Sequence, residues 1–116
     1  METPQKTPAE LFAAQALASQ VKKELTENIL PYWMGKMTNP DGGFYGRIDG
    51  LENLDPESPV GNIMTARMLW TFASAYRLLG NQEYLDMALR AKDFIISNFY
   101  DPELGGTYWS LTSEGA

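Results

Sequence analysis

The first part of the chain has an apolar residue every three or four positions, which is typical of a helix with one apolar face. These residues are Leu11, Ala14, Leu17, Val21, Leu25 and Ile29. Thr7 as N-cap, Pro8 at the first helical position and Glu10 after it form a capping box, which predicts where the helix begins. Because a proline disfavours helical backbone in the residue before it, we expect this helix to end or kink at Leu30, before Pro31.

A second apolar stretch differs from the first, because its large side chains point in nearly every direction around a helix axis. They are Ile63, Met64, Met68, Leu69, Trp70, Phe72, Tyr76 and Leu78. Ser58 as N-cap and Pro59 predict the start of this helix, and Gly80 predicts its end after Leu79. A helix that is apolar on all sides is a buried one. We expect so short a chain to leave part of it uncovered.

A third helix is predicted over residues 82–98, with Asn81 as its N-cap. It is amphipathic, and its apolar stripe comprises Leu85, Ala88, Ala91, Ile95 and Phe99. The charged residues that lie largely outside the stripe, on a predicted solvated face, are Asp86, Arg90, Lys92 and Asp93. Amphipathic and all-apolar helices therefore alternate, as expected where outer helices cover inner ones.

Two glycine-rich loops repeat the same order of residue types. One reads NPDGGFY from Asn39, and the other reads DPELGGTYW from Asp101. Paired glycines supply the positive φ angles of tight turns, so each loop predicts a short hairpin. With the helices, the loops indicate an internal repeat of amphipathic helix, Gly-Gly-aromatic hairpin and buried helix. The predicted fold class is all-α, a partial two-layer toroid of about three helices with two short hairpins.

Composition narrows the chemistry that this chain can perform. It has 116 residues and a net charge of −6, and an acidic surface disfavours binding to nucleic acid. It contains neither Cys nor His, which excludes disulfides, Cys-ligated metals and a Ser-His-Asp site within the chain. No stretch is apolar and long enough to span a membrane, and the N-terminus lacks the order of a secretory signal. We therefore expect a cytoplasmic protein with no membrane partner.

Several motifs, taken in order, resemble the opening of proteins of the N-acylglucosamine 2-epimerase family, cellobiose 2-epimerases most of all. They are ELTENIL at 24–30, GGFYG at 42–46, GNIMTARMLWTF at 61–72, AYR at 75–77 and GGTYW at 105–109. The resemblance implies an (α/α)6 barrel, with residues 1–6 disordered and residues 7–116 as its N-terminal segment. It implies reversible epimerisation at C2 of a reducing-end sugar, between gluco and manno configurations, without a metal or other cofactor.

The resemblance makes Arg67 the candidate catalytic and substrate-binding residue. It matches the arginine of the family's Gly-x-Ile-x-x-x-Arg-x-Leu-Trp motif. The family's chemistry removes the C2 proton and forms an enediolate, whose oxygen a permanent cation with forked donors can hold. The alternative is a structural ion pair of Arg67 with Asp49 or Glu52.

Three aromatic residues of the loops are candidate sugar-binding residues: Tyr45, Tyr108 and Trp109. Aromatic rings offer flat apolar platforms to the C–H faces of sugars. The alternative is that these rings close the end of the barrel and pack against helices. No metal ligand is predicted.

The resemblance also implies what this chain lacks. The family uses His as the C2 bases, on inner helices that come later, and this chain has no His. We expect the chain to be the N-terminal part of an epimerase that acts on a monosaccharide or disaccharide, and to be inactive alone. One alternative is a non-catalytic helical module that binds carbohydrate or self-associates to cover helix 61–79. Another is an (α/α)-barrel glycoside hydrolase, although no carboxylate lies between Gly61 and Leu79.

Overall fold

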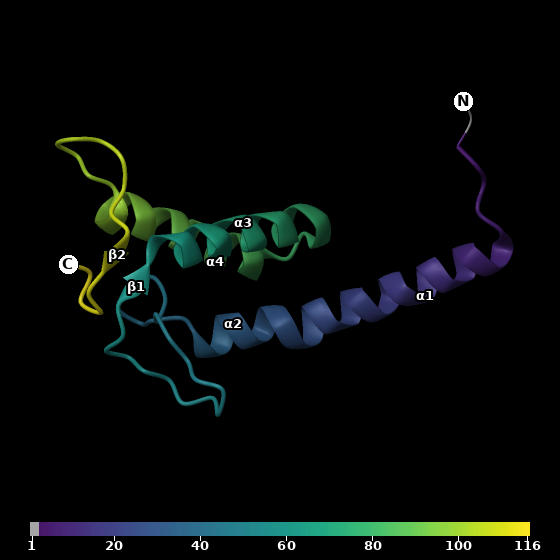
Figure 1. Cartoon of the computed structure of the whole chain (residues 1–116), viewed down its shortest axis with the longest axis horizontal. Helices are drawn as coiled ribbons and strands as arrows, with labels where there is room; N and C mark the ends of the chain where they lie inside the picture. The colour runs from purple at the N-terminus through teal and green to yellow at the C-terminus, as the bar shows by residue number, and fades with distance from the viewer. Residues whose placement is uncertain (1–2) are drawn as a thin grey trace. The chain divides into compact units, whose positions relative to one another are not determined.

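The computed structural model describes residues 3–116 and shows a mostly helical chain (Figure 1). The chain divides into two compact units, one ending at Gly35 and the other spanning Lys36–Ala116. The elements are α1 (Pro8–Glu24), the π-helical turn η1 (Leu25–Ile29), α2 (Leu30–Lys36), β1 (Val60–Gly61), α3 (Asn62–Leu79), α4 (Gln82–Phe94), the π-helical turn η2 (Ile95–Phe99) and β2 (Ser110–Leu111). Of these described elements, no helix is long and apolar enough to cross a membrane. The disorder expected over residues 1–6 stays a prediction, because residues 1 and 2 lie outside the described part.

The first unit begins its helix at the predicted capping box. The Thr7 hydroxyl accepts a hydrogen bond from the Glu10 amide at 3.2 Å, and the Glu10 carboxylate accepts one from the Thr7 amide at 2.7 Å. These bonds satisfy two donors that a helix start would otherwise leave unpaired, and they lower the pKa of Glu10. No residue of α1 is buried.

The helix continues past Pro31 to Lys36, so of the two outcomes predicted at Leu30, an end or a kink, the end is wrong. Leu30 itself has helical angles, with φ −64° and ψ −46°. A five-residue π turn precedes the proline, and in it the Leu30 amide donates to the Leu25 carbonyl. Proline lacks an amide and its ring crowds the preceding turn, and a wider π turn accommodates such an interruption without ending the helix.

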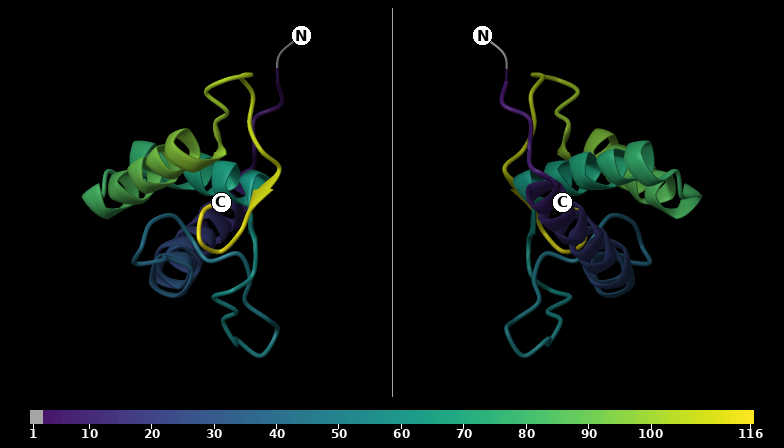
Figure 2. Two further views of the ribbon diagram at one scale, coloured as in Figure 1. Left: turned by 90° about the vertical axis from the view of Figure 1, so that its left-hand side faces the viewer. Right: turned by 90° about the vertical axis from the view of Figure 1, so that its right-hand side faces the viewer.

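In the second unit, α3 and α4 lie side by side and are connected by Gly80 and Asn81 (Figure 2). Gly80 ends α3 in the left-handed conformation, with φ 79°, as predicted. The rings of Phe72 and Tyr84 lie 6.3 Å apart between the helices. The buried residues of the pair are Thr65, Met68, Phe72, Ala75, Tyr84, Met87, Ala88 and Ala91.

The predicted stripe of the third helix is confirmed in part. Ala88, Ala91 and Phe99 are buried, whereas Leu85 and Ile95 are half-buried. Phe99 joins a small apolar cluster under the β1–β2 pair. Asn81 is the N-cap residue, but its side chain makes no capping hydrogen bond.

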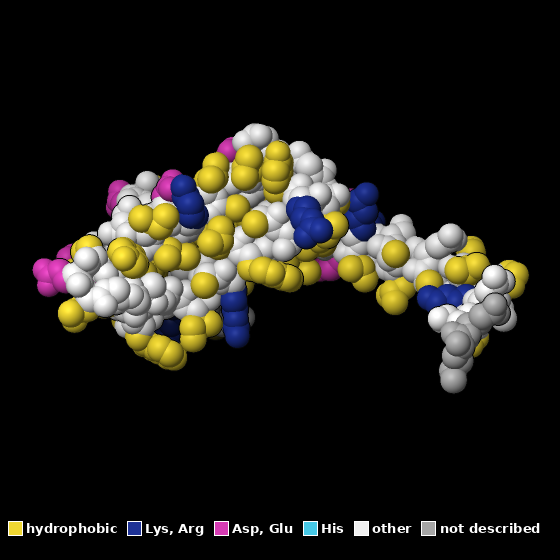
Figure 3. All heavy atoms as spheres, turned by 90° about the horizontal axis from the view of Figure 1, so that it is seen from above, with side chains coloured by type: hydrophobic (Ala, Val, Ile, Leu, Met, Phe, Trp, Pro, Cys, Tyr) yellow, Lys and Arg dark blue, Asp and Glu magenta, His cyan; other side chains and the backbone are white. Residues whose placement is uncertain are grey.

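One face of α3 is buried and the opposite face is open, as expected for a chain too short to cover this helix. Ile63 and Trp70, seven positions apart on the open face, are 48% and 73% exposed. Figure 3 shows hydrophobic side chains spread over the surface in that view. The exposed apolar area is the kind that marks an interaction surface.

The predicted helix start at Ser58–Pro59 is wrong, because α3 begins at Asn62 with Gly61 as its N-cap. Val60 and Gly61 instead form β1, which pairs antiparallel with Leu111 and Ser110 of β2. Residues that local signals assign to a helix therefore pair as a strand with a segment far along the chain.

The first Gly-Gly loop is the predicted hairpin and is called hairpin 1 (residues 37–45). Thr38 and Phe44 form an antiparallel bridge. The Asn39 amide donates to the Gly43 carbonyl at 3.2 Å, and the Tyr45 amide donates to the Met37 carbonyl at 2.8 Å. The Gly42 amide also donates to Asn39 at 3.1 Å, and both glycines have positive φ.

The second loop, hairpin 2 (residues 99–109), repeats this bonding pattern. Tyr100 and Thr107 form the bridge. The amides of Asp101, Gly105 and Tyr108 donate to the carbonyls of Gly106, Asp101 and Phe99, at 3.0, 3.0 and 2.9 Å. Each bond has its counterpart in hairpin 1, with one residue, Leu104, inserted between. The hairpin part of the repeat predicted from the sequence is thus confirmed at the level of individual hydrogen bonds.

Candidate functional site

Arg67 lies on the open face of α3, between Ile63 and Trp70. Its side chain is exposed and makes no hydrogen bond or ion pair with any residue that the structure describes. The ion pair considered as an alternative, with Asp49 or Glu52, is not formed. Glu52 instead pairs with Lys36, whose Nζ lies 3.1 Å from a carboxylate oxygen of Glu52. The guanidinium is therefore available to a ligand.

The acidic loop that contains Asp49 satisfies its own hydrogen bonds. The Asp49 carboxylate accepts bonds from the amides of Leu51 and Asn53, both at 2.8 Å, and from the Asn53 side chain at 3.1 Å. The bonds from Asn53 are the main reason that the pKa of Asp49 is lowered. Among residues 3–116, no three carboxylates come together in a way that would hold a metal ion.

Hairpin 2 is held at the N-terminal end of α3. The Asn62 amide donates to the Trp109 carbonyl at 3.0 Å, and the Asn62 side chain donates to the Thr107 hydroxyl at 2.7 Å. Asn62 lies five residues before Arg67, which is about 7.5 Å along the helix axis. Trp109 is 78% exposed and Tyr108 is 44% exposed, so a large part of each side chain remains accessible to a ligand.

Hairpin 1 also ends near the start of α3. A Cβ atom at Gly46, the residue after Tyr45, would lie 1.9 Å from the Pro59 carbonyl oxygen, so only glycine allows these two segments to approach so closely. The Tyr45 side chain is half-buried. The structure thus brings the backbone near Tyr45 and Trp109 to the end of α3 that carries Arg67. No hydrogen bond or ring contact joins these three side chains in the described part of the chain.

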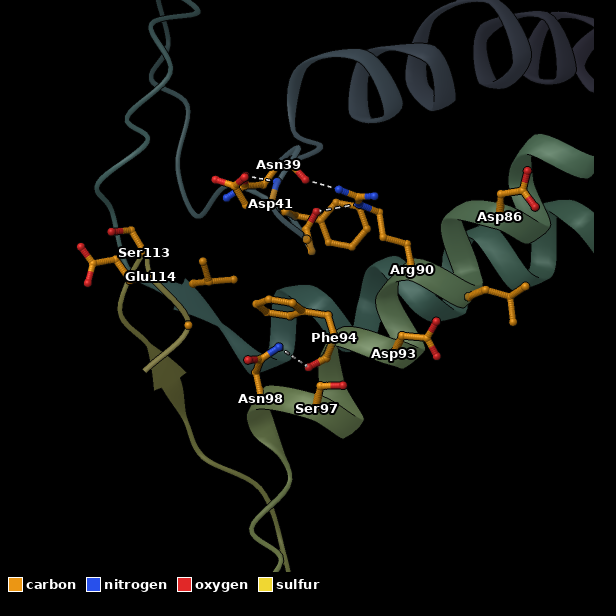
Figure 4. Close-up of a pocket in the computed structure, with 16 residues that line it drawn as sticks. Asn39, Asp41, Asp86, Arg90, Asp93, Phe94, Ser97, Asn98, Ser113 and Glu114 are labelled. Atoms are coloured by element: carbon orange, nitrogen blue, oxygen red, sulfur yellow. Dashed lines mark hydrogen bonds between the residues drawn. The ribbon is translucent and has the colours of Figure 1, made fainter.

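A pocket of about 780 Å³ lies elsewhere, against α4. It is bordered by hairpin 1, α4 and the last residues of the chain, and Figure 4 shows Asp86, Arg90 and Asp93 on the α4 wall. None of the four predicted site residues borders it. The pocket and the predicted sugar site are therefore separate features.

Arg90 has a role that sequence reasoning missed. Its Nε donates to the Gly43 carbonyl at 2.9 Å and its Nη2 donates to the Asn39 carbonyl, so the side chain points from α4 into hairpin 1 (Figure 4). One turn further along α4, the Phe94 ring lies against Gly43, where a Cβ atom would come within 2.6 Å of it. The signal in the sequence is an arginine and an aromatic residue four positions apart on one helix face.

Comparison with known proteins identifies the family. Residues 43–116, more than half of the chain, match the family model described as N-acylglucosamine 2-epimerase (GlcNAc 2-epimerase). The chain belongs to the N-acylglucosamine 2-epimerase family. The resemblance seen in the sequence is therefore confirmed, and the glycoside hydrolase alternative gains no support.

Individual relatives agree with this assignment. A cellobiose 2-epimerase of Bacteroides fragilis is 54% identical over 102 residues, which cover 87% of this chain and 26% of that protein. One from Ruminococcus albus is 42% identical over 100 residues, 85% of this chain and 25% of the relative. The structure of cellobiose 2-epimerase from Spirochaeta thermophila superposes with a TM-score of 0.85 at 37% identity, over 96% of this chain and 27% of that one.

These likenesses confirm the predicted fold class. The chain is mostly helical and corresponds to part of the (α/α)6 barrel of its structural neighbours. It spans about a quarter of the length of the relatives that it matches.

Proposed function

We propose that this chain contributes the sugar-binding arginine of a carbohydrate 2-epimerase that interconverts gluco- and manno-configured reducing-end sugars. Membership of the family and the cellobiose 2-epimerases among its relatives support a sugar as the small-molecule substrate. Cellobiose is the substrate we favour, and the cytoplasm is the compartment. The observation that carries the proposal is the exposed guanidinium of Arg67 on the open face of α3, which has no partner within residues 3–116.

The proposed reaction moves a single proton. In the open-chain sugar a base removes the C2 proton, and the electron pair of the broken C–H bond forms an enediolate with negative charge on oxygen. A proton returned to the other face of C2 gives the epimer, with no net change in atoms or electrons. Arg67 binds the charged oxygen, and a fixed cation that meets charge developing in the transition state lowers the barrier.

The aromatic residues are proposed to hold the sugar ring. Trp109 and Tyr108 are exposed on hairpin 2, whose backbone is bonded to the start of α3. Tyr45 lies at the corresponding position of hairpin 1. A ring beside the Arg67 end of α3 would stack on the C–H face of a sugar while the guanidinium binds its oxygens.

The chain alone is proposed to be inactive, because a C2 base needs a pKa near neutrality and the chain has no His. The carboxyls with shifted pKa values, Glu10 and Asp49, have values that are lowered, further from neutrality. Burial raises the pKa of Tyr84, which also moves this pKa away from neutrality.

A chimera tests the proposal, with this chain replacing the matching quarter of the Bacteroides fragilis cellobiose 2-epimerase. We expect the chimera to epimerise cellobiose and Arg67→Gln to lower kcat by about 10²–10³-fold, the usual effect of losing one oxyanion donor. Arg77→Gln, on the same helix and also exposed, is the matched control and should change kcat less than about threefold. Equal activity of the Arg67→Gln and Arg77→Gln chimeras, or turnover by the 116-residue chain alone, would contradict the proposal.

A second candidate function is self-association through the open face of α3. Trp70 is 73% exposed there, and a large exposed aromatic ring on an apolar face is a common anchor of interfaces. We expect light scattering to show the 116-residue chain above monomer mass, and Trp70→Gln to lower that mass. Trp109→Gln, at a ring that is equally exposed but lies on hairpin 2, should leave the mass unchanged. A monomeric wild-type chain would contradict this candidate.

A further inference from the structure

Hairpin 2 differs from hairpin 1 at the residues that follow its Gly-Gly turn. In the two bridges, Thr107 of hairpin 2 corresponds to Phe44 of hairpin 1. Two residues further along, Trp109 corresponds to Gly46. Phe44 is 1% exposed and Gly46 lies against the backbone of Pro59, so hairpin 1 uses both positions for packing. In hairpin 2 the same positions carry a hydroxyl and an indole ring that are both exposed.

The side chain of Asn62 determines how the Thr107 hydroxyl can act. Its Nδ2 lies 2.7 Å from the Thr107 Oγ1, and the nitrogen of a side-chain amide can only donate. The hydroxyl oxygen is therefore the acceptor of that bond, and its own proton can be donated elsewhere. Among residues 3–116, no acceptor takes this proton. Sugars carry hydroxyl and ring oxygens that accept hydrogen bonds, so Thr107 offers a donor that such a ligand can use.

The backbone around Asn62 fixes the position of this hydroxyl at the start of α3. The Asn62 amide donates to the Trp109 carbonyl at 3.0 Å, so Asn62 holds hairpin 2 through both its backbone and its side chain. β1, directly before Asn62, pairs with β2, directly after Trp109. Asn62 itself is half-buried. The Thr107 hydroxyl is therefore held at the end of the helix that carries Arg67, with Asn62 and Arg67 about 7.5 Å apart along the helix axis.

We infer that Thr107 is a further sugar-binding residue whose hydroxyl donates to an oxygen of the substrate, and that Asn62 is the positioning residue that orients it. The inference rests on the proposed function, since it concerns the same sugar that Arg67 binds. It adds a polar contact beside Trp109, whose apolar ring does not distinguish the positions of hydroxyl groups. A donor that is already oriented loses little freedom on binding, so this contact favours sugars with an acceptor oxygen at that place.

Binding of cellobiose to the chimera with the Bacteroides fragilis enzyme tests the role of Thr107. Titration calorimetry in the Arg67→Gln background, which slows turnover, gives Kd whether or not the chimera epimerises the sugar. Thr107→Val removes the hydroxyl and keeps the shape of the side chain. We expect it to raise Kd about 3- to 10-fold, the usual effect of one hydrogen bond, while Thr107→Ser keeps Kd within about twofold. With Arg67 intact, Thr107→Val should raise KM more than it lowers kcat.

Reversing the bond at Asn62 separates positioning from mere attachment of the hairpin. Asn62→Asp keeps a hydrogen bond to Thr107, but a carboxylate only accepts, so the hydroxyl must donate to it and is lost to the sugar. We expect Asn62→Asp to raise Kd as much as Thr107→Val does, and the double variant to bind no more weakly than either single one. Asn81→Asp, the same change at the exposed start of α4, is the matched control and should keep Kd within about twofold.

The inference and the proposed function fail in different ways. Unchanged Kd in Thr107→Val would overturn the inference, because the hydroxyl would then donate nothing to the sugar. Unchanged Kd in Asn62→Asp would overturn the positioning role, because the direction of the bond would then be irrelevant. A chimera that shows the expected losses of binding but does not epimerise cellobiose would refute the proposed reaction and leave Thr107 as a sugar-binding residue. A parent chimera that binds no cellobiose would overturn both.

Discussion

Replacing Arg90 by methionine is expected to release hairpin 1 from α4 while leaving the rest of the unit folded. Methionine keeps much of the apolar stem and removes the bonds to Gly43 and Asn39. Both carbonyls retain a backbone hydrogen bond, so no buried acceptor is left unpaired. Hydrogen bonds from a charged donor contribute about 1.5 kcal/mol or more each, and with a half-buried side chain the pair should contribute about 2 kcal/mol.

Amide hydrogen exchange measures this loss locally. A loss of about 2 kcal/mol raises the opening equilibrium about 30-fold, so the amides of Asn39 and Tyr45 should exchange about 30-fold faster. The amides of Asp101 and Tyr108 make the equivalent bonds in hairpin 2, which Arg90 does not touch, and should be unchanged.

Arg77→Met is the matched control, because it removes from α3 an exposed arginine that has no hydrogen-bond or ion-pair partner among residues 3–116. It should change exchange in neither hairpin. Unchanged protection of hairpin 1 in Arg90→Met would show that Arg90 does not hold it. The reasoning also fails if Arg90→Met accelerates both hairpins equally, since that would mean a global loss of stability.

Three further predictions follow from the same contacts. Gly43→Ala should lower the free energy of unfolding by about 2 to 5 kcal/mol in urea denaturation, since it combines a positive φ of 64° with an overlap on the Phe94 ring; an unchanged midpoint would refute the packing. Phe72→Ala should cost about 3 to 5 kcal/mol by the same measurement, because its ring is fully buried, and a loss below about 1 kcal/mol would contradict its place in the core. The hydrogen bonds from Asn53 lower the pKa of Asp49, so their stabilisation is present above the usual value of 3.8 and is lost as the pH falls through the lowered one; an NMR titration that places this pKa at or above 3.8 would refute the bonding.

Local signals in the sequence predicted the features that depend on neighbouring residues. The capping box at Thr7, the left-handed Gly80 and the Gly-Gly turns each arise from residues a few positions apart. The open face of α3 was predictable too, since the apolar residues of one helix exceed what two neighbours can cover.

The features that were missed depend on partners far along the chain. Ser58 and Pro59 have the signature of a helix start, but Val60 pairs with Leu111, and that ladder delays the helix. Arg90 has the pattern of a solvated charge. Its acceptors are backbone carbonyls, which every residue type has, so only its spacing of four residues from Phe94 indicates its role in the sequence.

The sequence predicted which residues belong to the candidate site, but not how they are placed. The resemblance selected Arg67. The structure adds that its guanidinium has no partner among the described residues and that hairpin 2 is bonded to the same end of α3. Whether the rings of Trp109 and Tyr108 turn toward Arg67 depends on a bound sugar and stays a prediction.

Epimerisation of cellobiose in D₂O by the chimera with the Bacteroides fragilis enzyme tests the central claim most directly. Proton NMR follows the C2 position of both the product and the recovered substrate. If a C2 proton is removed and the enediolate is held by Arg67, deuterium enters C2 of both sugars. Arg67→Gln should then slow exchange and epimerisation together, by about 10²–10³-fold, while Arg77→Gln slows neither. A manno product that keeps its C2 proton, or an Arg67→Gln chimera that exchanges at the original rate, would contradict the account.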